Sequence, residues 1–176
     1  MSLGWSRRAP VDSLVGTEAV VDFTIPLAEL PRVSHELSTT DGEARGNVHF
    51  SRQAGYAVAD LDVSAQPEVV CQRCMQAMRW PIIVKSRIAL VSDYDAADRV
   101  PAGLEVFLVE ADSVSVRDLV DEEILMALPN VARHAEGSEC AGGNMQLPEQ
   151  QGEAEEAADA QVQKPFAQLG ELLKRK

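Results

Sequence analysis

The sequence is short of aromatic residues, of basic residues and of long apolar runs. Phe, Trp and Tyr make up 5% of its 176 residues, so a core must be built mainly from Val, Leu, Ile and Ala. Lys and Arg number 16 against 28 Asp and Glu, which gives a formal net charge of −12. This charge repels phosphate over most of the surface and favours basic protein partners over bare RNA, unless it serves solubility alone.

The lack of long apolar runs also bears on location. No uncharged apolar run approaches the roughly 18 residues needed to span a bilayer, so we expect no membrane segment. Arg7 and Arg8 precede Ala-Pro-Val-Asp rather than an apolar stretch, which argues against a twin-arginine export signal. We therefore expect a cytoplasmic protein. In a reducing cytoplasm, a Cys-x-x-Cys pair indicates metal or redox chemistry more often than a disulfide.

The apolar patterning predicts an α+β fold, with a mostly antiparallel sheet, one main packed helix and a tethered C-terminal helix. Strand-like segments occur at residues 19–25, 46–51, 56–63, 68–71, 80–91 and 104–110. Gly55 marks a hairpin turn between two of them. The main helix is expected over residues 116–128, with Ser115 as its N-cap and Pro129 ending it. Within it, the consecutive acids Asp121, Glu122 and Glu123 are expected on a solvated face rather than as an acid/base pair.

The composition divides the chain into four expected parts. Residues 1–18 are predicted to be a loose leader, 19–141 the α+β core, 142–163 an acidic flexible linker and 164–176 a basic amphipathic helix. We expect the last part to bind a partner, unless it folds back on its own domain. Its binding side chains are Phe166, Leu169, Leu172, Leu173, Lys174, Arg175 and Lys176.

Four soft ligands indicate a metal site. The spacing of Cys71 and Cys74 lets two thiolates from one turn reach the same ion, and His134 and Cys140 supply a third and a fourth ligand for tetrahedral zinc. Two alternatives remain open. The cysteines are reduced and hold no metal, or Cys71 and Cys74 serve a thiol-dependent redox enzyme or sensor. The redox alternative is disfavoured because the surroundings lack a βαβ thioredoxin pattern.

A run of basic residues surrounds the paired cysteines. No acidic residue occurs between Glu68 and Asp93, and this stretch carries Arg73, Arg79, Lys85 and Arg87 beside Trp80. Such a ribbon would contact RNA phosphates, or a protein partner, and stack its indole on a base. The alternative, which we favour because acidic residues are in surplus, is that these cations pair with carboxylates of the same chain.

Motifs for catalysis are missing. The sequence has no nucleophile elbow, no phosphate-binding P-loop and no dinucleotide-binding glycine motif. We therefore expect neither an enzyme nor a small-molecule substrate.

Three segments in a fixed order resemble the bacterial YceD family, a domain of unknown function linked to accumulation of large-subunit ribosomal RNA. They are residues 71–74, residues 119–129 with His134 and Cys140, and residues 164–176. The likeness covers roughly residues 20–176 and looks like the proteobacterial branch. It implies a cytoplasmic, non-enzymatic factor that supports 23S ribosomal RNA synthesis, processing or stability, with a ribosomal protein, a ribosomal RNA precursor or both as partners. Other branches carry more cysteines near Cys140, so a fully cysteine-ligated site is excluded here.

Overall fold

The computed structural model describes residues 4–135 and residue 140. Its strands are β1 (Ala9–Pro10), β2 (Val20–Pro26), β3 (Glu43–Gln53), β4 (Tyr56–Ala65), β5 (Glu68–Val70), β6 (Ala77–Arg79), β7 (Ile82–Val91), β8 (Glu105–Leu108) and β9 (Ser113–Val114). Its helices are α1 (Val11–Gly16), the 3-10 turn η1 (Leu27–Glu29), α2 (Pro31–Ser34), α3 (Tyr94–Ala97) and α4 (Val116–Ala127). No helix of the described residues is long and apolar enough to cross a membrane.

A five-stranded sheet in the order β2-β3-β4-β7-β8 forms the body of the domain. Its first four strands are antiparallel neighbours, whereas β8 runs parallel to β7 at the edge. The β3–β4 hairpin turns through Ala54 and Gly55, whose φ angles of 49° and 88° lie in the left-handed region that favours glycine. The α+β class and the mostly antiparallel sheet are confirmed.

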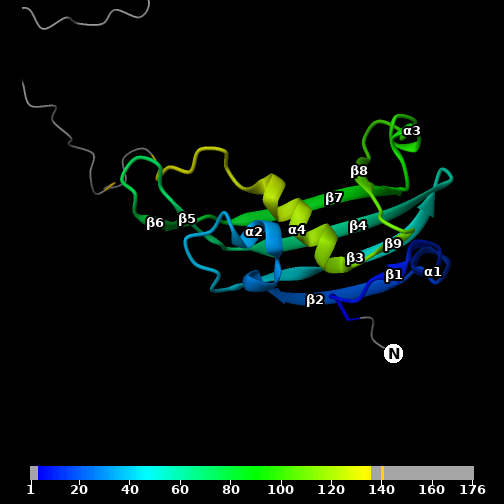
Figure 1. Ribbon diagram of the computed structural model, residues 1–176, viewed down its shortest axis with the longest axis horizontal. Helices are drawn as coiled ribbons and strands as arrows, with labels where there is room; N and C mark the ends of the chain where they lie inside the picture. Colours follow the sequence, from blue (N-terminus) through cyan, green and yellow to red (C-terminus); the bar gives the residue numbers. More distant parts are fainter. Residues whose placement is uncertain (1–3, 136–139, 141–176) are drawn as a thin grey trace, which may run out of the picture. The chain divides into compact units, whose positions relative to one another are not determined.

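One face of the sheet carries the core and α4 (Figure 1). Helix α4 buries an apolar stripe of Val116, Leu119, Val120 and Ile124. The side chain of Ser115 accepts a hydrogen bond from the backbone N–H of Asp118 at 3.2 Å, so the predicted helix and its N-cap are confirmed. The opposite face carries mainly polar side chains, among them the ion pairs Lys85–Asp62 and Arg87–Asp60, as is usual for an antiparallel sheet with one solvated face.

The beginning of the chain corrects a prediction. Residues 1–18 were expected to be a loose leader, but β1 pairs with β9 and α1 packs into the core. Helix α1 buries Val11, Leu14 and Val15. These positions follow the i, i+3, i+4 spacing of one helix face, but a six-residue helix gives too short a periodic signal to be recognised from sequence.

The acidic run of α4 corrects a second prediction. Glu122 lies at the surface and forms an ion pair with Arg32, but Asp121 and Glu123 are only 4% and 5% exposed. The carboxylate of Asp121 accepts backbone N–H groups of Arg32 at 3.1 Å and Val33 at 3.0 Å. It thereby caps α2, which has no capping side chain at its own N-terminus. The face was predicted to be solvated because α2 was not recognised as packing beside α4.

Glu123 is a buried carboxyl group with a second carboxyl group beside it. Burial, together with a hydrogen bond to Glu105, raises the pKa of Glu123 from 4.5 to about 7. The protonated form is therefore the one that the fold favours. In the unfolded chain the group ionises near 4.5, so its contribution to stability is complete below that pH. The contribution is lost as pH rises through about 7.

We expect Glu123→Gln to become more stable than the wild type as pH rises from about 5 to about 8, by about 1–3 kcal/mol at the upper end. The amide removes the cost of ionising a buried carboxyl group. Urea unfolding at several pH values measures this difference. Glu110→Gln is the matched control, because its side chain is 87% exposed and its curve should follow the wild type. Parallel curves for the wild type and Glu123→Gln would contradict the raised pKa.

Candidate metal centre

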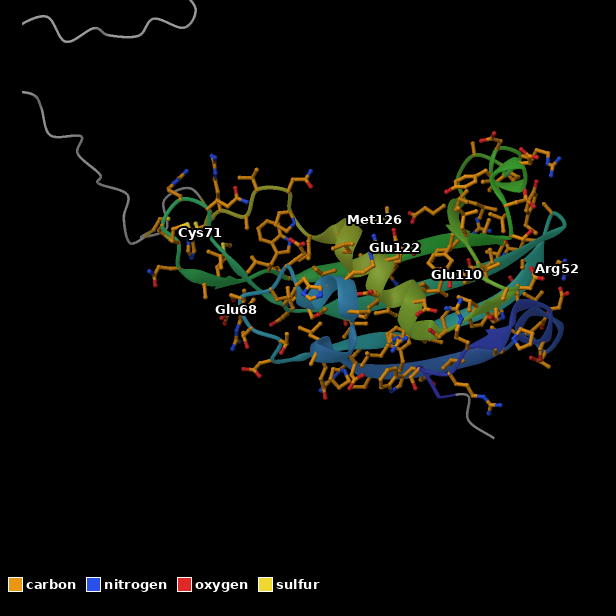
Figure 2. All side chains as sticks on the ribbon, in the orientation of Figure 1. Arg52, Glu68, Cys71, Glu110, Glu122 and Met126 are labelled. Carbon is orange, nitrogen blue, oxygen red and sulfur yellow. The ribbon has the colours of Figure 1, made fainter. Side chains whose placement is uncertain are left out.

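The hairpin of β5 and β6 presents the two paired cysteines in one tight loop. The backbone N–H of Cys71 donates to the carbonyl of Gln76 at 2.9 Å, and that of Met75 donates to the carbonyl of Cys71 at 2.8 Å. Met75 adopts a left-handed φ of 58°, which closes the loop. We call residues 71–76 the knuckle. Cys71 in the knuckle and Arg52 near the β3–β4 turn lie at opposite ends of the domain (Figure 2).

The segment after α4 supplies the second arm of the site. The helix ends at Ala127, two residues before Pro129, and the chain then runs back toward the knuckle. The backbone N–H of Gln72 donates to the carbonyl of Ala132 at 2.8 Å, and Ala132 is buried. This contact holds His134 beside the knuckle.

Four ligand atoms converge where the two arms meet. Those of Cys71, Cys74, His134 and Cys140 all lie within 4.8 Å of one another. The sulfur atoms of Cys71 and Cys140 are 3.8 Å apart. The His134 Nδ1 atom lies 3.5 Å from the Cys74 sulfur and 3.6 Å from the Cys140 sulfur.

These separations fit tetrahedral zinc. Zinc bonds of about 2.3 Å to sulfur and about 2.0–2.1 Å to nitrogen place neighbouring ligand atoms about 3.8 Å apart for two sulfurs and about 3.6 Å apart for sulfur and nitrogen. The predicted convergence of the four residues is therefore present, with a ligand set suited to the ion.

The electrostatics of the cluster favour a cation. The backbone N–H of Cys74, followed by those of His134 and Arg73, outweighs burial and lowers the pKa of the Cys71 thiol to about 5. In contrast, the Cys74 side chain, burial and Cys71 raise the pKa of Cys140 to about 11. Three thiols in one small volume cannot all ionise without a positive charge among them. A divalent metal removes this conflict, because a coordinating thiol is deprotonated.

The predicted basic ribbon separates into two parts. Lys85 and Arg87 form salt bridges with Asp62 and Asp60 across the β4–β7 pair, so they are not free for the contact considered from the sequence. Arg73 and Arg79 are exposed and form no salt bridge with any described residue. Trp80 is half-buried and packs against the core, so part of its ring is covered by the protein itself.

Two features beside the cluster were missed from the sequence. Arg133, which directly precedes His134, is exposed and has no salt bridge among the described residues. A groove of about 570 Å³ lies next to the knuckle, with Val70, Met75, Leu125 and Leu128 among its lining. We call it the knuckle groove. Its lining comes from separate segments of the chain, so no local sequence pattern predicts the groove. Arg133 could have been predicted as part of the site, because it directly precedes the ligand His134. The predicted linker, residues 142–163, and the predicted tail, residues 164–176, both lie outside the described residues.

Comparison with known proteins identifies the family. The model of the large ribosomal RNA subunit accumulation protein YceD matches residues 59–173, a range that includes the whole cluster and α4. Neither the curated proteins nor the solved structures contain a significant match. The family match covers more than half of the chain, and it agrees with the resemblance carried by the cysteine pair, the α4 segment and the tail. The chain therefore belongs to the YceD family of large ribosomal RNA subunit accumulation proteins.

Proposed function

We propose that this protein is a non-enzymatic, cytoplasmic factor that supports 23S ribosomal RNA synthesis, processing or stability during biogenesis of the large ribosomal subunit. The observation that carries the proposal is the family match over residues 59–173, since the family is named for accumulation of this RNA. The partners proposed are a ribosomal protein, a ribosomal RNA precursor or both. A small-molecule substrate forms no part of the proposal, and assignment to the proteobacterial branch remains a prediction.

We further propose that Cys71, Cys74, His134 and Cys140 hold a structural zinc ion. Four protein ligands leave zinc no open position for substrate, which is typical of structural rather than catalytic sites. The ion would stabilise the fold by joining the knuckle to the segment after α4. The ligands Cys74 and His134 are 60 positions apart, so a bond through zinc also restricts the unfolded chain.

The redox alternative receives no support from the family match. A redox site needs only the two thiols of Cys71 and Cys74. Here the His134 Nδ1 atom also lies within 3.6 Å of the sulfur atoms of both Cys74 and Cys140. A ring nitrogen at that distance from two thiols is what a fourth zinc ligand requires. This contact is the observation that favours metal binding over disulfide exchange.

The tail has a separate proposed role. Residues 142–163 are proposed to be a flexible acidic linker, and residues 164–176 an amphipathic helix that binds the ribosomal partner. The proposal depends on the sequence alone: Phe166, Leu169, Leu172 and Leu173 lie beside Lys174, Arg175 and Lys176. Apolar side chains on a helix face fit a groove, and the cations add an electrostatic contact.

Protein purified without chelator should contain about one zinc ion per chain, and His134→Ala should lower this content and the melting temperature. Mass spectrometry of metal content and thermal unfolding measure both. His49→Ala is the matched control, because His49 lies on β3, outside the cluster, and its loss should leave the zinc content unchanged. A chelator should lower the melting temperature of the wild type more than that of His134→Ala. A wild-type protein that takes up no zinc when supplied with it would contradict the site.

A strain lacking the protein should contain less 23S relative to 16S ribosomal RNA, and the full chain should restore the ratio. A chain without residues 164–176 should restore it poorly while its melting temperature stays nearly unchanged, because the tail is proposed to bind a partner rather than the core. Quantification of both RNAs tests the function. An unchanged ratio in the deletion strain would overturn it, and a large drop in melting temperature on truncation would assign the tail to the domain's own core.

A further inference from the structure

The knuckle end of the domain combines unpaired positive charge with a groove. Elsewhere in the described residues, Arg7, Arg79 and Arg99 form no salt bridge, but most arginines pair with carboxylates, namely Arg8, Arg32, Arg45, Arg52, Arg87 and Arg117. Arg73 and Arg133 do not, although the chain as a whole carries a net charge of −12. Two cations without partners at one site, in a protein with a surplus of carboxylates, indicate a ligand with negative charge.

Backbone contacts bring these two arginines onto neighbouring segments. Arg73 follows Gln72, whose N–H donates to the carbonyl of Ala132 at 2.8 Å, and Arg133 follows Ala132. The same two segments carry Cys74 and His134, whose Sγ and Nδ1 atoms lie 3.5 Å apart in the four-ligand cluster. The hydrogen bond between Gln72 and Ala132 holds the backbone of both arginines side by side, which lowers the entropic cost of ordering them around a ligand.

The groove beside the arginines has a lining suited to an uncharged, flat group. Val70, Met75, Leu125 and Leu128 provide apolar surface, and Gln72, Asn130 and Glu36 add polar groups. Amide side chains recognise the edges of nucleobases, and a carboxylate accepts a hydrogen bond from an exocyclic amine. The carboxylate of Glu36 repels a phosphate but not a base. The lining thus fits a base, while the arginines outside the groove fit phosphates.

We propose that the knuckle and the knuckle groove bind a single-stranded segment of RNA, with Arg73 and Arg133 on consecutive backbone phosphates and an unstacked base in the groove. This inference rests on the proposed function, because it identifies the RNA precursor as a direct partner. A single strand is favoured over a duplex, because only an unpaired base can leave its stack and enter a groove. Arg79 is not included, because it lies opposite Glu68 in the β5–β6 pair and lines a different hollow with Asp41 and Glu43.

The test is fluorescence anisotropy of the full zinc-loaded chain with a short labelled single-stranded RNA of mixed sequence and with the matching duplex. We expect R73A/R133A to weaken single-strand binding by about tenfold or more and to reduce the slope of log affinity against log salt by about 1.4. The matched control is K85A/R87A, which removes the same charge from residues already paired with Asp62 and Asp60 and should change affinity by less than about twofold.

A second variant tests the groove. Met75 is 71% exposed, so Met75→Glu should fold normally, which melting temperature and zinc content check, yet it should weaken single-strand binding several-fold. Equal losses in both arginine variants, equal affinity for duplex, or no RNA binding by the wild type would each overturn the inference. Retained RNA affinity in R73A/R133A together with lost binding of a ribosomal protein would assign this end to a protein partner and overturn it as well.

Complementation separates this inference from the proposed function. If R73A/R133A restores the ratio of 23S to 16S ribosomal RNA as well as the wild type does, direct RNA contact at the knuckle is wrong while the family function stands. If the deletion strain has an unchanged ratio, the proposed function fails whatever the anisotropy shows. A variant that melts like the wild type, binds RNA weakly and restores the ratio poorly supports both.

Discussion

The convergence of Cys71, Cys74, His134 and Cys140 is the constraint on which the proposed metal site at this end of the domain depends. The β5–β6 hairpin has strands of three residues each, and a pair this short has little stability of its own. The backbone bond from Gln72 to Ala132 joins it to the segment after α4, and a metal ion held by the four ligands would add a second link. Without the metal, three crowded thiols would oppose one another's ionisation at this junction.

The body of the domain supplies the fixed positions that the cluster needs. Helix α4 packs on one face of the sheet, and the residues that follow its C-terminus extend to the knuckle. Asp121 joins α4 to α2 by capping the shorter helix, so the elements around the groove are held by buried polar contacts as well as by apolar packing. The proposed metal site and the proposed RNA contact of Arg73 and Arg133 would therefore be supported by packed elements of the domain.

Part of the fold and part of the candidate site could be predicted from the sequence, for reasons that differ from residue to residue. Helix α4 was recognisable because its apolar stripe, Ser115 and Pro129 are local signals. The cluster was recognisable because soft ligands are rare in this chain. The burial of Asp121 could not be predicted, because it depends on packing against α2, which lies about 90 positions away in the sequence. The knuckle groove was missed for the same reason: segments far apart in the sequence line it, and their packing leaves no periodic pattern in the sequence.

The most direct test of the four-ligand site is X-ray absorption at the zinc edge of the full chain purified without chelator. A tetrahedral site of Cys71, Cys74, Cys140 and His134 predicts about three sulfur neighbours near 2.3 Å and about one nitrogen near 2.0–2.1 Å. Three sulfur neighbours at thiolate distance require all three cysteines of the chain, and the single nitrogen requires a histidine. No bound zinc, or a coordination shell of oxygen and nitrogen with fewer than three sulfurs, would contradict the site and the role of zinc in holding the knuckle.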